Sequence, residues 1–395
     1  MMGKVKTTQG RVLVLADDLT GALEAGAKFA GQGIATLVAV DEGEEAPKVS
    51  HDFPVLVLDM ETRHVSPDEA ARRVYEQVRR AVADGFTTIY KKTDSTLRGN
   101  IGSELRGLWE ACPGSGLLYV PAYPKMGRTV KGGVLHVDGQ PVSTTEFGFD
   151  ALNPVGQSSI PRLLASHIPS PIVSIDEKRL HLGSGDALYV CDADSEEEVE
   201  GLARFFVESG VFSLAAGPSA FLHYLARQMK LPRRLPPPLP RVRRALIVNG
   251  SRNKRSAGQI RYAKENGFPV VDSAKGVIRM GDRGWGILGD RTPAAESSDE
   301  AAARMAKKVV SILNKTEIEG LVIFGGDTAY AVIRALGQLV IRPIGEVLEG
   351  IPVSLIRLHC PSRDVAGSER DIVLVTKAGG FGPTNVLPTI RNALA

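Results

Sequence analysis

Two polar segments that each follow an apolar run contain residue types suited to binding a small hydroxylated anion. Residues 17–21 read Asp-Asp-Leu-Thr-Gly, and residues 91–100 read Lys-Lys-Thr-Asp-Ser-Thr-Leu-Arg-Gly-Asn. The adjacent acids Asp17 and Asp18 point in different directions from a strand end, so one can cap the next helix while the other accepts a proton or binds an ion. We therefore expect one functional carboxylate at this position rather than two.

The second segment offers groups for a carboxylate and for hydroxyls. Arg98 can hold a carboxylate through two parallel hydrogen bonds, and Lys91 or Lys92 adds positive charge. Asp94 and Ser95 can bond to sugar hydroxyls. Because aspartate is a common helix cap, an alternative interpretation makes Asp94 an N-cap and Arg98 its partner on the helix surface.

A further cation lies in a long stretch without helical periodicity. Residues 121–161 are rich in Gly, Pro and Thr, which predicts an ordered functional loop with short strands. Within it, Arg128 follows Gly127 and adds positive charge to the candidate site. The alternative is an exposed arginine on a structural hairpin.

Three glycine-containing segments in the C-terminal part, at 249–251, 325–328 and 377–382, are typical of phosphate-binding loops. Glycine lets the backbone approach an anion, and helix N-termini present N–H groups to it. The candidate nucleotide-binding residues are Ser251, Gly325, Gly326, Asp327, Thr328, Gly379 and Gly380. A helix cap would explain Asp327 equally well, and a tight turn would explain the glycines after residue 378.

The elements that must position these segments alternate between short apolar runs and helical patterns. Several runs are apolar on successive residues, as in strands covered on both faces of a parallel sheet. Predicted helices begin at the N-caps Ser66, Ser195 and Ser297, each with glutamate three residues later. The predicted strands are 11–15, 35–40, 55–59, 87–90, 117–120, 172–175, 188–191, 211–215, 245–248, one near 270, 321–324, 353–356 and 372–375.

A proline-rich segment divides the chain, which at 395 residues is too long for one ordinary core. Residues 231–244 contain five prolines and are expected to form an extended linker between domains 1–230 and 245–395. The predicted fold class is α/β, with two doubly wound, largely parallel-sheet domains. Because ligands bind beyond the carboxyl ends of such strands, and every polar segment follows a predicted strand, we expect an active site in the cleft between the domains.

Composition and spacing exclude several classes of protein. A net charge of +3 gives no support to a nucleic-acid partner. Cys112, Cys191 and Cys360 are scattered, which fits a reducing cytoplasm rather than a disulfide framework or a zinc site. The seven histidines lack metal-binding spacing, and no apolar run is long enough for a signal peptide or a membrane span.

With these motifs in view, the chain resembles the four-carbon acid sugar kinase family, which includes D-threonate, D-erythronate and 3-oxo-tetronate kinases. The resemblance spans nearly the whole chain, and the string Asp-Ser-Thr-Leu-Arg-Gly-Asn at 94–100 is its most specific part. It also rests on ADDLTGA at 16–22, the stretch at 121–142, GGDTAYAV at 325–332 and TKAGGFG at 376–382. It implies an N-terminal domain that binds the acid sugar and a C-terminal domain that binds ATP. The γ-phosphoryl group would pass to the terminal C4 hydroxyl.

The resemblance also implies roles for individual residues. The family's nucleotide contacts fall on Ser251, on Gly325–Thr328 and on Gly379. The chain departs from the family's common pattern at residues 23–24, where it has Leu-Glu instead of Asn-Asp, and at residues 250–253, where it has Gly-Ser-Arg-Asn instead of Gly-Ser-Cys-Ser.

Phosphoryl transfer requires alignment, charge neutralisation and a base for the attacking hydroxyl. Our hypothesis makes Asp18 the base or hydroxyl-orienting acid, with Asp17 and Asp94 as alternatives. In this hypothesis, Arg98 and Lys92 hold the substrate carboxylate. Mg²⁺ is bound mainly by the phosphates of ATP, and no protein ligand of the metal is assigned.

Two other functions remain open at this stage. A nucleotide-dependent dehydrogenase would use the G-x-G-x-x-G spacing at 284–289, but that spacing does not open a predicted helix. A non-catalytic sensor would need the same pockets without a base. The sequence leaves the acid and its stereochemistry open, and equally the oligomeric state, a homodimer included.

Overall fold

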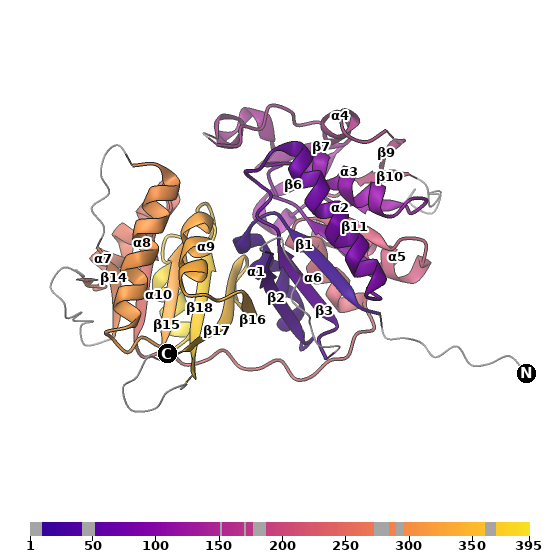
Figure 1. The fold of residues 1–395 in the computed structure, drawn as a ribbon. Coiled ribbons are helices and arrows are strands. Elements are labelled where there is room, and N and C mark those ends of the chain that lie inside the picture. Colours follow the sequence, from indigo (N-terminus) through magenta and orange to yellow (C-terminus); the bar gives the residue numbers. More distant parts are fainter. Residues whose placement is uncertain are drawn as a thin grey trace, which may run out of the picture. The chain divides into compact units, whose positions relative to one another are not determined.

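The chain folds into two compact units (Figure 1). The first comprises Met1–Thr36 and Asp41–Arg234, and the second comprises Leu37–Val40 and Leu235–Ala395. The structure is a computed structural model. It describes residues 10–41, 52–150, 152–169, 171–176, 187–271, 284–289, 296–359 and 369–395.

Parallel strands form the main sheet of the first unit, in the order β3-β1-β4-β11-β5-β10-β9. All residues of β1 and β3 are buried, which explains why these strands are apolar on successive residues. The strands are β1 (Val12–Ala16), β3 (Val55–Asp59), β4 (Thr88–Lys92), β5 (Leu117–Tyr119), β9 (Ile172–Ile175), β10 (Leu188–Cys191) and β11 (Leu214–Gly217).

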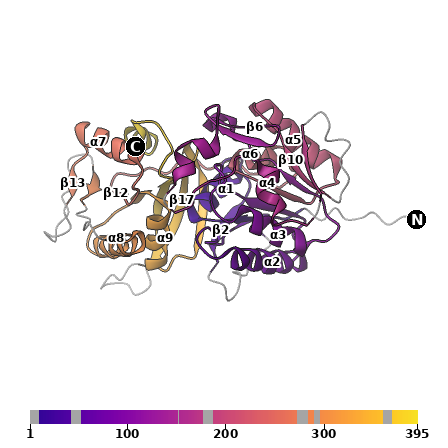
Figure 2. The same ribbon diagram turned by 90° about the horizontal axis from the view of Figure 1, so that it is seen from above.

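Helices cover both faces of this sheet. α2 packs against α3, and α6 packs against α1 and α5; Figure 2 shows α5 and α6 on the opposite side of the sheet from α2 and α3. The predicted N-caps Ser66 and Ser195 are confirmed, since each hydroxyl accepts the amide of the glutamate three residues later. The helices are α1 (Leu19–Ala30), α2 (Pro67–Ala83), α3 (Ile101–Ala111), α5 (Glu196–Ser209) and α6 (Ser219–Gln228).

The described part of the glycine- and proline-rich stretch, residues 121–150 and 152–161, contains short strands, as predicted. Its antiparallel sheet consists of β6 (Arg128–Lys131), β7 (Val134–Val137) and β8 (Gln140–Pro141). Short 3₁₀ helices follow at Val142–Thr144 and Glu146–Phe149, and α4 (Ile160–Ala165) ends the stretch.

The sheet of the second unit has the order β13-β14-β12-β15-β18-β17-β16-β2. The pairs from β13 to β18 are parallel, as predicted. The pairs from β18 through β17 and β16 to β2 are antiparallel. The strands are β2 (Thr36–Val40), β12 (Ala245–Asn249), β13 (Val270–Val271), β14 (Trp285–Leu288), β15 (Gly320–Phe324), β16 (Val340–Leu348), β17 (Ile351–His359) and β18 (Glu369–Lys377).

The antiparallel strands differ from the prediction of a largely parallel sheet, and β16 is absent from the predicted strands. A two-residue turn, Glu349-Gly350, joins β16 to β17, and Gly350 adopts a φ of +71°. A turn with positive φ at glycine lets the chain reverse tightly enough for hairpin pairing. β2 reaches this sheet from far away in sequence, since Val38 and Ala39 pair with Ile341 and Val340.

Helices α7 (Lys254–Glu265), α8 (Ser298–Leu313), α9 (Gly326–Ala335) and α10 (Val386–Ala393) complete the second unit. Ser297 caps α8 in a reciprocal capping box with Glu300, as predicted. The core gathers residues of β12, β15 and β18 with α7 and α10, including Ile247, Phe324 and Leu387. Among the described helices, none combines the length and apolar character needed to cross a membrane.

Candidate functional site

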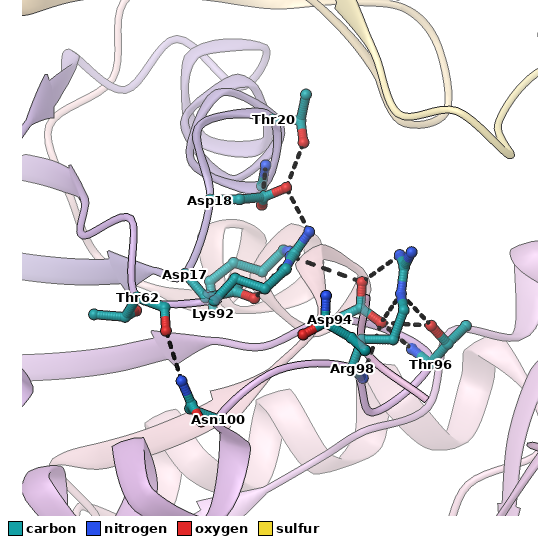
Figure 3. Close-up of polar contacts among 12 residues, drawn as sticks. Asp17, Asp18, Thr20, Thr62, Lys92, Asp94, Thr96, Arg98 and Asn100 are labelled. Carbon is teal, nitrogen blue, oxygen red and sulfur yellow. Dashed lines mark hydrogen bonds and ion pairs between the residues drawn. The ribbon is translucent and has the colours of Figure 1, made fainter. Parts of the chain in front are cut away.

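Three neighbouring strands bring the polar segments of the first unit to one edge of its sheet. Ala16 pairs with Asp59 on one side and with Lys92 on the other, so β1, β3 and β4 end level with each other. The end of β4 and the loops after the three strands supply Asp17, Asp18, Arg63, Lys92, Asp94 and Arg98, which we call the acceptor edge. Figure 3 labels all of these residues except Arg63. Ligands of parallel α/β sheets bind beyond such strand ends.

Arg63 links the acids of the acceptor edge. Its Nε lies 2.7 Å from Asp17 Oδ2, its Nη1 lies 2.8 Å from Asp18 Oδ2, and its Nη2 lies 3.8 Å from Asp94 Oδ2. Arg63 is not among the site residues predicted from the sequence. The available signal was its position four residues after a predicted strand, at the edge where the other two loops end.

Asp18 is both the N-cap of α1 and an ion-paired acid. It accepts the amide of Gly21 at 2.9 Å and the hydroxyl of Thr20 at 2.7 Å. Burial raises the pKa of Asp18, but the charges of Arg63 and Lys92 and these hydrogen bonds bring it below its ordinary value. The carboxylate is therefore ionised at neutral pH, and 15% of its side chain stays exposed.

Asp17 lies deeper than Asp18, with 2% of its side chain exposed. Its Oδ2 accepts Arg63, while its Oδ1 is buried and has no hydrogen-bond partner among the described residues. A buried oxygen without a partner is costly, so Asp17 Oδ1 is a candidate acceptor for a bound hydroxyl or water.

Gly21 gives Asp18 and Lys92 room to approach each other. A Cβ at this position would lie 2.6 Å from Asp18 Oδ1 and 2.7 Å from Lys92 Nζ. The glycine after Thr20 is thus a spatial requirement of the acceptor edge rather than a turn signal.

Asp94 and Arg98 form a bidentate ion pair, with Nη2 2.7 Å from Oδ2 and Nε 3.2 Å from Oδ1. Burial raises the pKa of Asp94, but the charges of Arg98 and Arg63 hold it well below its ordinary value. The alternative of a helix cap is wrong for Asp94, because Asn100 is the N-cap of α3. Its carboxylate instead accepts the amide of Thr96 at 2.9 Å and fixes the turn that carries Arg98.

The two lysines at the end of β4 have different surroundings. Lys91 is fully buried, and its Nζ lies 3.1 Å from Glu104 Oε2 in α3. Lys92 lies over Gly21 beside Asp18. Burial raises the pKa of Glu104 despite the neighbouring Lys91. Lys92 is therefore the better placed of the two for a ligand of the acceptor edge.

Arg128 and Arg98 both lie close to the aromatic ring of Phe147, which places Arg128 near the acceptor edge. The guanidinium carbons of Arg98 and Arg128 lie 5.6 Å and 5.7 Å from the centroid of Phe147. Arg98 Nη1 also lies 3.5 Å from Asp150. Phe147 and Asp150, in the long stretch after β5, therefore lie close to Arg98, which follows β4.

Ser95 is buried, and the contacts of the described residues do not assign it a role.

The glycine-containing segments of the second unit also converge. Asn249 pairs with Phe324, and Phe324 pairs with Lys377, so the loops after β12, β15 and β18 share one edge. A Cβ on Gly250 would lie 1.8 Å from Thr328 Oγ1, and a Cβ on Gly379 would lie 2.6 Å from Ser251 Oγ. We call Ser251, Gly325, Gly326, Asp327, Thr328, Gly379 and Gly380 the nucleotide edge.

Two alternatives for this region are settled by the geometry. Asp327 is not the cap of α9, because Gly325 holds that position with a φ of +107°, and Asp327 lies in the first turn. The G-x-G-x-x-G spacing at 284–289 runs along β14 rather than opening a helix, so it is not a dinucleotide fingerprint. Within the described residues, no group of three or more His, Cys, Asp or Glu side chains is arranged to hold a metal ion.

Known protein families also divide the chain into an N-terminal and a C-terminal domain, which contain the acceptor edge and most of the nucleotide edge respectively. The family model of a sugar-binding N-terminal domain matches residues 12–225, and that of a nucleotide-binding C-terminal domain matches residues 287–387. A D-threonate kinase from Bordetella bronchiseptica is 28% identical over 97% of this chain and 96% of its own. A D-erythronate kinase from Heliobacterium modesticaldum is 26% identical over 96% and 95%, and a 3-oxo-tetronate kinase from Burkholderia multivorans is 24% identical over 96% of both chains.

Solved structures share the fold. A protein from Salmonella typhimurium LT2 matches with a TM-score of 0.76 at 21% identity, over 97% of this chain and 98% of that one. A protein from Bordetella bronchiseptica, 26% identical, matches with a TM-score of 0.50 over 97% and 98%; it was crystallised with citrate as a domain-swapped dimer.

A sugar-binding domain followed by a nucleotide-binding domain defines a class of carbohydrate kinases, and the ion-paired acids and glycine loops fit that class. The chain belongs to the four-carbon acid sugar kinase family.

Proposed function

We propose that the chain transfers the γ-phosphoryl group of ATP to the terminal C4 hydroxyl of a four-carbon acid sugar such as D-threonate, D-erythronate or a 3-oxo-tetronate. The relatives with those names support the substrate class. The observation that carries the proposal is the carboxylate of Asp18, which Arg63 and Lys92 hold ionised while part of it stays exposed.

In this proposal, Asp18 orients the C4 hydroxyl and accepts its proton. A loose phosphoryl-transfer transition state needs little deprotonation of the nucleophile before the bond forms, so an acid with a lowered pKa can still serve. Asp17 lies too deep to be the first choice, and Asp94 is engaged with Arg98. Both remain the alternatives to Asp18.

Arg98 and Lys92 bind the carboxylate of the acid sugar in this proposal. Asp94 holds Arg98 through Nε and Nη2, and Asp150 Oδ2 lies 3.5 Å from Nη1, so a bound carboxylate takes the place of Asp150 at Nη1. Arg128, whose guanidinium carbon lies 5.7 Å from the same Phe147 ring, adds positive charge nearby. A carboxylate between these cations gains charge-assisted hydrogen bonds that a neutral sugar cannot make.

The nucleotide edge binds ATP in this proposal, with glycine backbone amides and the N-terminus of α9 directed at its phosphates. ATP supplies the γ-phosphoryl group, and Mg²⁺ bound with it neutralises phosphate charge. The acceptor edge and the nucleotide edge lie in separate units, and a cleft that joins them is part of the proposal. A cytoplasmic location and a homodimer are also inferred.

An ADP-release screen tests the proposal. The purified chain is supplied with Mg²⁺, ATP and one acid at a time from D- and L-threonate, D- and L-erythronate and their 3-oxo derivatives. We expect ADP release that depends on at least one of them. Release with none of them would overturn the substrate class, and ADP binding that any of these acids alters without turnover would indicate a sensor.

Two variants test the assigned roles with the acid that turns over. Asp18→Asn keeps the helix cap and should lower kcat by about 10²- to 10⁴-fold, the usual contribution of a general base. Arg98→Ala should act mainly by raising KM for the acid. The control Asp68→Asn changes an aspartate whose side chain is 93% exposed and should leave both constants unchanged. Near wild-type turnover by Asp18→Asn would sink the assignment of Asp18.

A further inference from the structure

Lys377, the last residue of β18, is a fully buried lysine that no role described above uses. Its Nζ donates to Ser256 Oγ at 3.1 Å and lies 2.9 Å, 3.0 Å and 3.2 Å from the carbonyl oxygens of Ala378, Gly379 and Phe381. It also lies 4.4 Å from the centroid of the Phe324 ring. Within the described part of the chain, no carboxylate pairs with it.

A buried ammonium without a carboxylate is an expensive feature, which carbonyl dipoles and an aromatic face offset in part. Here the acceptors belong to the loop that immediately follows Lys377. Gln259 of α7 holds the same loop, because its Nε2 donates to the carbonyls of Phe381, Gly382 and Pro383 at 2.9 to 3.0 Å. Ser256 donates to the carbonyl of Gly379 at 2.8 Å.

These contacts determine which way the amides of the loop point. In a trans peptide unit, the C=O of one residue and the N–H of the next point in opposite directions. Because the carbonyls of Ala378, Gly379 and Phe381 point towards Lys377, the N–H groups of Gly379, Gly380 and Gly382 point away from it. No hydrogen-bond partner of these three amides is found among the described residues.

Successive outward N–H groups from glycines form a concave site for an anion. Gly379 touches Ser251, since a Cβ on it would meet Ser251 Oγ, so this site adjoins the rest of the nucleotide edge. We propose that Lys377 is a positioning residue that draws the loop carbonyls inward and thereby presents the amides of Gly379, Gly380 and Gly382 to the phosphates of the nucleotide. The inference rests on the proposed use of ATP.

The charge state of Lys377 gives the proposal a pH signature. Burial, and then the charge of Arg255 on α7, lower the pKa of Lys377 to about 7. Around it, β15 presents the uncharged Phe324, the loop presents no titratable side chain, and α9 carries Asp327 in its first turn. The ammonium has one more N–H donor than the neutral amine, so nucleotide binding favours the protonated form.

The test is the affinity of the full-length chain for ADP with Mg²⁺, measured by titration calorimetry. Lys377→Met, which keeps the length but removes charge and donors, should raise the Kd about tenfold or more at pH 7. In turnover assays it should raise KM for ATP and leave KM for the acid sugar within about twofold. The control Lys307→Met changes an exposed lysine on α8 and should bind ADP like the wild type.

Wild-type affinity should also fall as the pH rises from about 7 to about 9, and the Lys377→Met variant should lack this fall. The loss of affinity identifies the lysine, because the phosphates of ADP are almost fully ionised above pH 7 and would not by themselves weaken binding as the pH rises.

If Lys377→Met does not fold, Gln259→Leu decides the question, because it loosens the same loop at Phe381, Gly382 and Pro383 without touching the lysine. That variant should raise the Kd for ADP about threefold or more. A folded Lys377→Met variant, or failing that Gln259→Leu, that binds ADP as tightly as the wild type would overturn this inference alone. A wild-type chain that binds no adenine nucleotide would overturn it together with the proposed function.

Discussion

Arg63 determines the electrostatics of the acceptor edge, because three carboxylates would otherwise face each other in a buried site. Burial disfavours the charge of Arg63, but Asp17, Asp18 and Asp94 together raise its pKa well above the ordinary value. The arginine and its acids thus stabilise each other's charged forms. The function of Asp18 depends on this network as much as on Asp18 itself.

Replacement of Arg63 should therefore be severe. Arg63→Met leaves the buried Asp17 without its cation and takes one of two cations from Asp18 and from Asp94, and we expect a loss of about 3 to 5 kcal/mol in the free energy of unfolding. Urea denaturation measures the loss. The control Arg72→Met removes an arginine that pairs with Glu69 and Glu76 on the exposed surface of α2, and should cause no measurable change. If the two variants have equal free energies of unfolding, the ion pairs of Arg63 do not stabilise the fold.

Asp59 has the opposite electrostatic behaviour to Asp18. It ends β3 with no side-chain exposure, and its Oδ2 has no hydrogen-bond partner among the described residues. Burial, followed by the charges of Glu61 and Asp18, raises the pKa of Asp59 well above its ordinary value. The folded chain therefore retains a proton that the unfolded chain releases near pH 4.

This raised pKa predicts a pH-dependent stability difference. The contribution of Asp59 is fully present below its unfolded pKa and is lost as the pH rises towards its folded pKa. Asp59→Asn has no charge to bury, so its stability relative to the wild type should increase by about 1.4 kcal/mol per pH unit within that window. Denaturation curves across pH 4 to about 8 measure the difference. Parallel stability profiles for the two proteins would contradict the raised pKa.

At the scale of elements, the sequence was informative where a local pattern has one physical cause. Continuous apolar runs identified most of the parallel strands, though not β14, and Ser66, Ser195 and Ser297 identified three helix starts because each hydroxyl caps its own helix. In the hairpin of β16 and β17, β17 was predicted from the sequence but β16 was not. Its Glu349-Gly350 turn lacks the asparagine or aspartate that marks such turns, and Pro343 argues against a strand.

The same contrast holds for the site. The segments at 17–21, 91–100, 325–328 and 377–382 were recognisable because polar residues and glycines follow strands directly. Arg63 was not, since it stands four residues beyond its strand and its importance comes from the register of β3 beside β1. The role proposed for Lys377 likewise depends on α7, more than a hundred residues away in sequence.

Helix packing gives a prediction at the scale of elements. Gly107 of α3 lies against the backbone of α2, and a Cβ there would be 2.3 Å from the carbonyl oxygen of Ala71. Gly107→Ala must separate the two helices, so we expect a loss of about 1 to 3 kcal/mol in the free energy of unfolding. Gly258→Ala in α7 is the control, because no atom lies near its Cβ, and it should gain about 0.5 to 1 kcal/mol. Changes of the same sign would contradict this account of the packing.

At the scale of the whole molecule, the chain separates two kinds of polar edge into two compact units. The first unit carries the cations and acids suited to a hydroxylated acid. The second carries the glycine loops suited to phosphates. The chain crosses between the units three times, because the segment Leu37–Val40 belongs to the second unit, where Val38 and Ala39 pair with β16, before the chain returns to the first. The second unit is therefore not complete without a segment from the N-terminal part of the sequence.

The proposed reaction forms a phosphate ester at the terminal carbon of the acid sugar, and ³¹P NMR of the product tests this most directly. The chain is incubated with Mg²⁺, ATP and the acid that supports ADP release, and the phosphorus signal of the product is recorded with proton coupling. A phosphate ester on the terminal carbon of a tetronate couples to the two C4 protons, and we predict that triplet. A doublet from an ester at C2 or C3, an uncoupled acyl phosphate, or no new phosphorus signal would contradict the account.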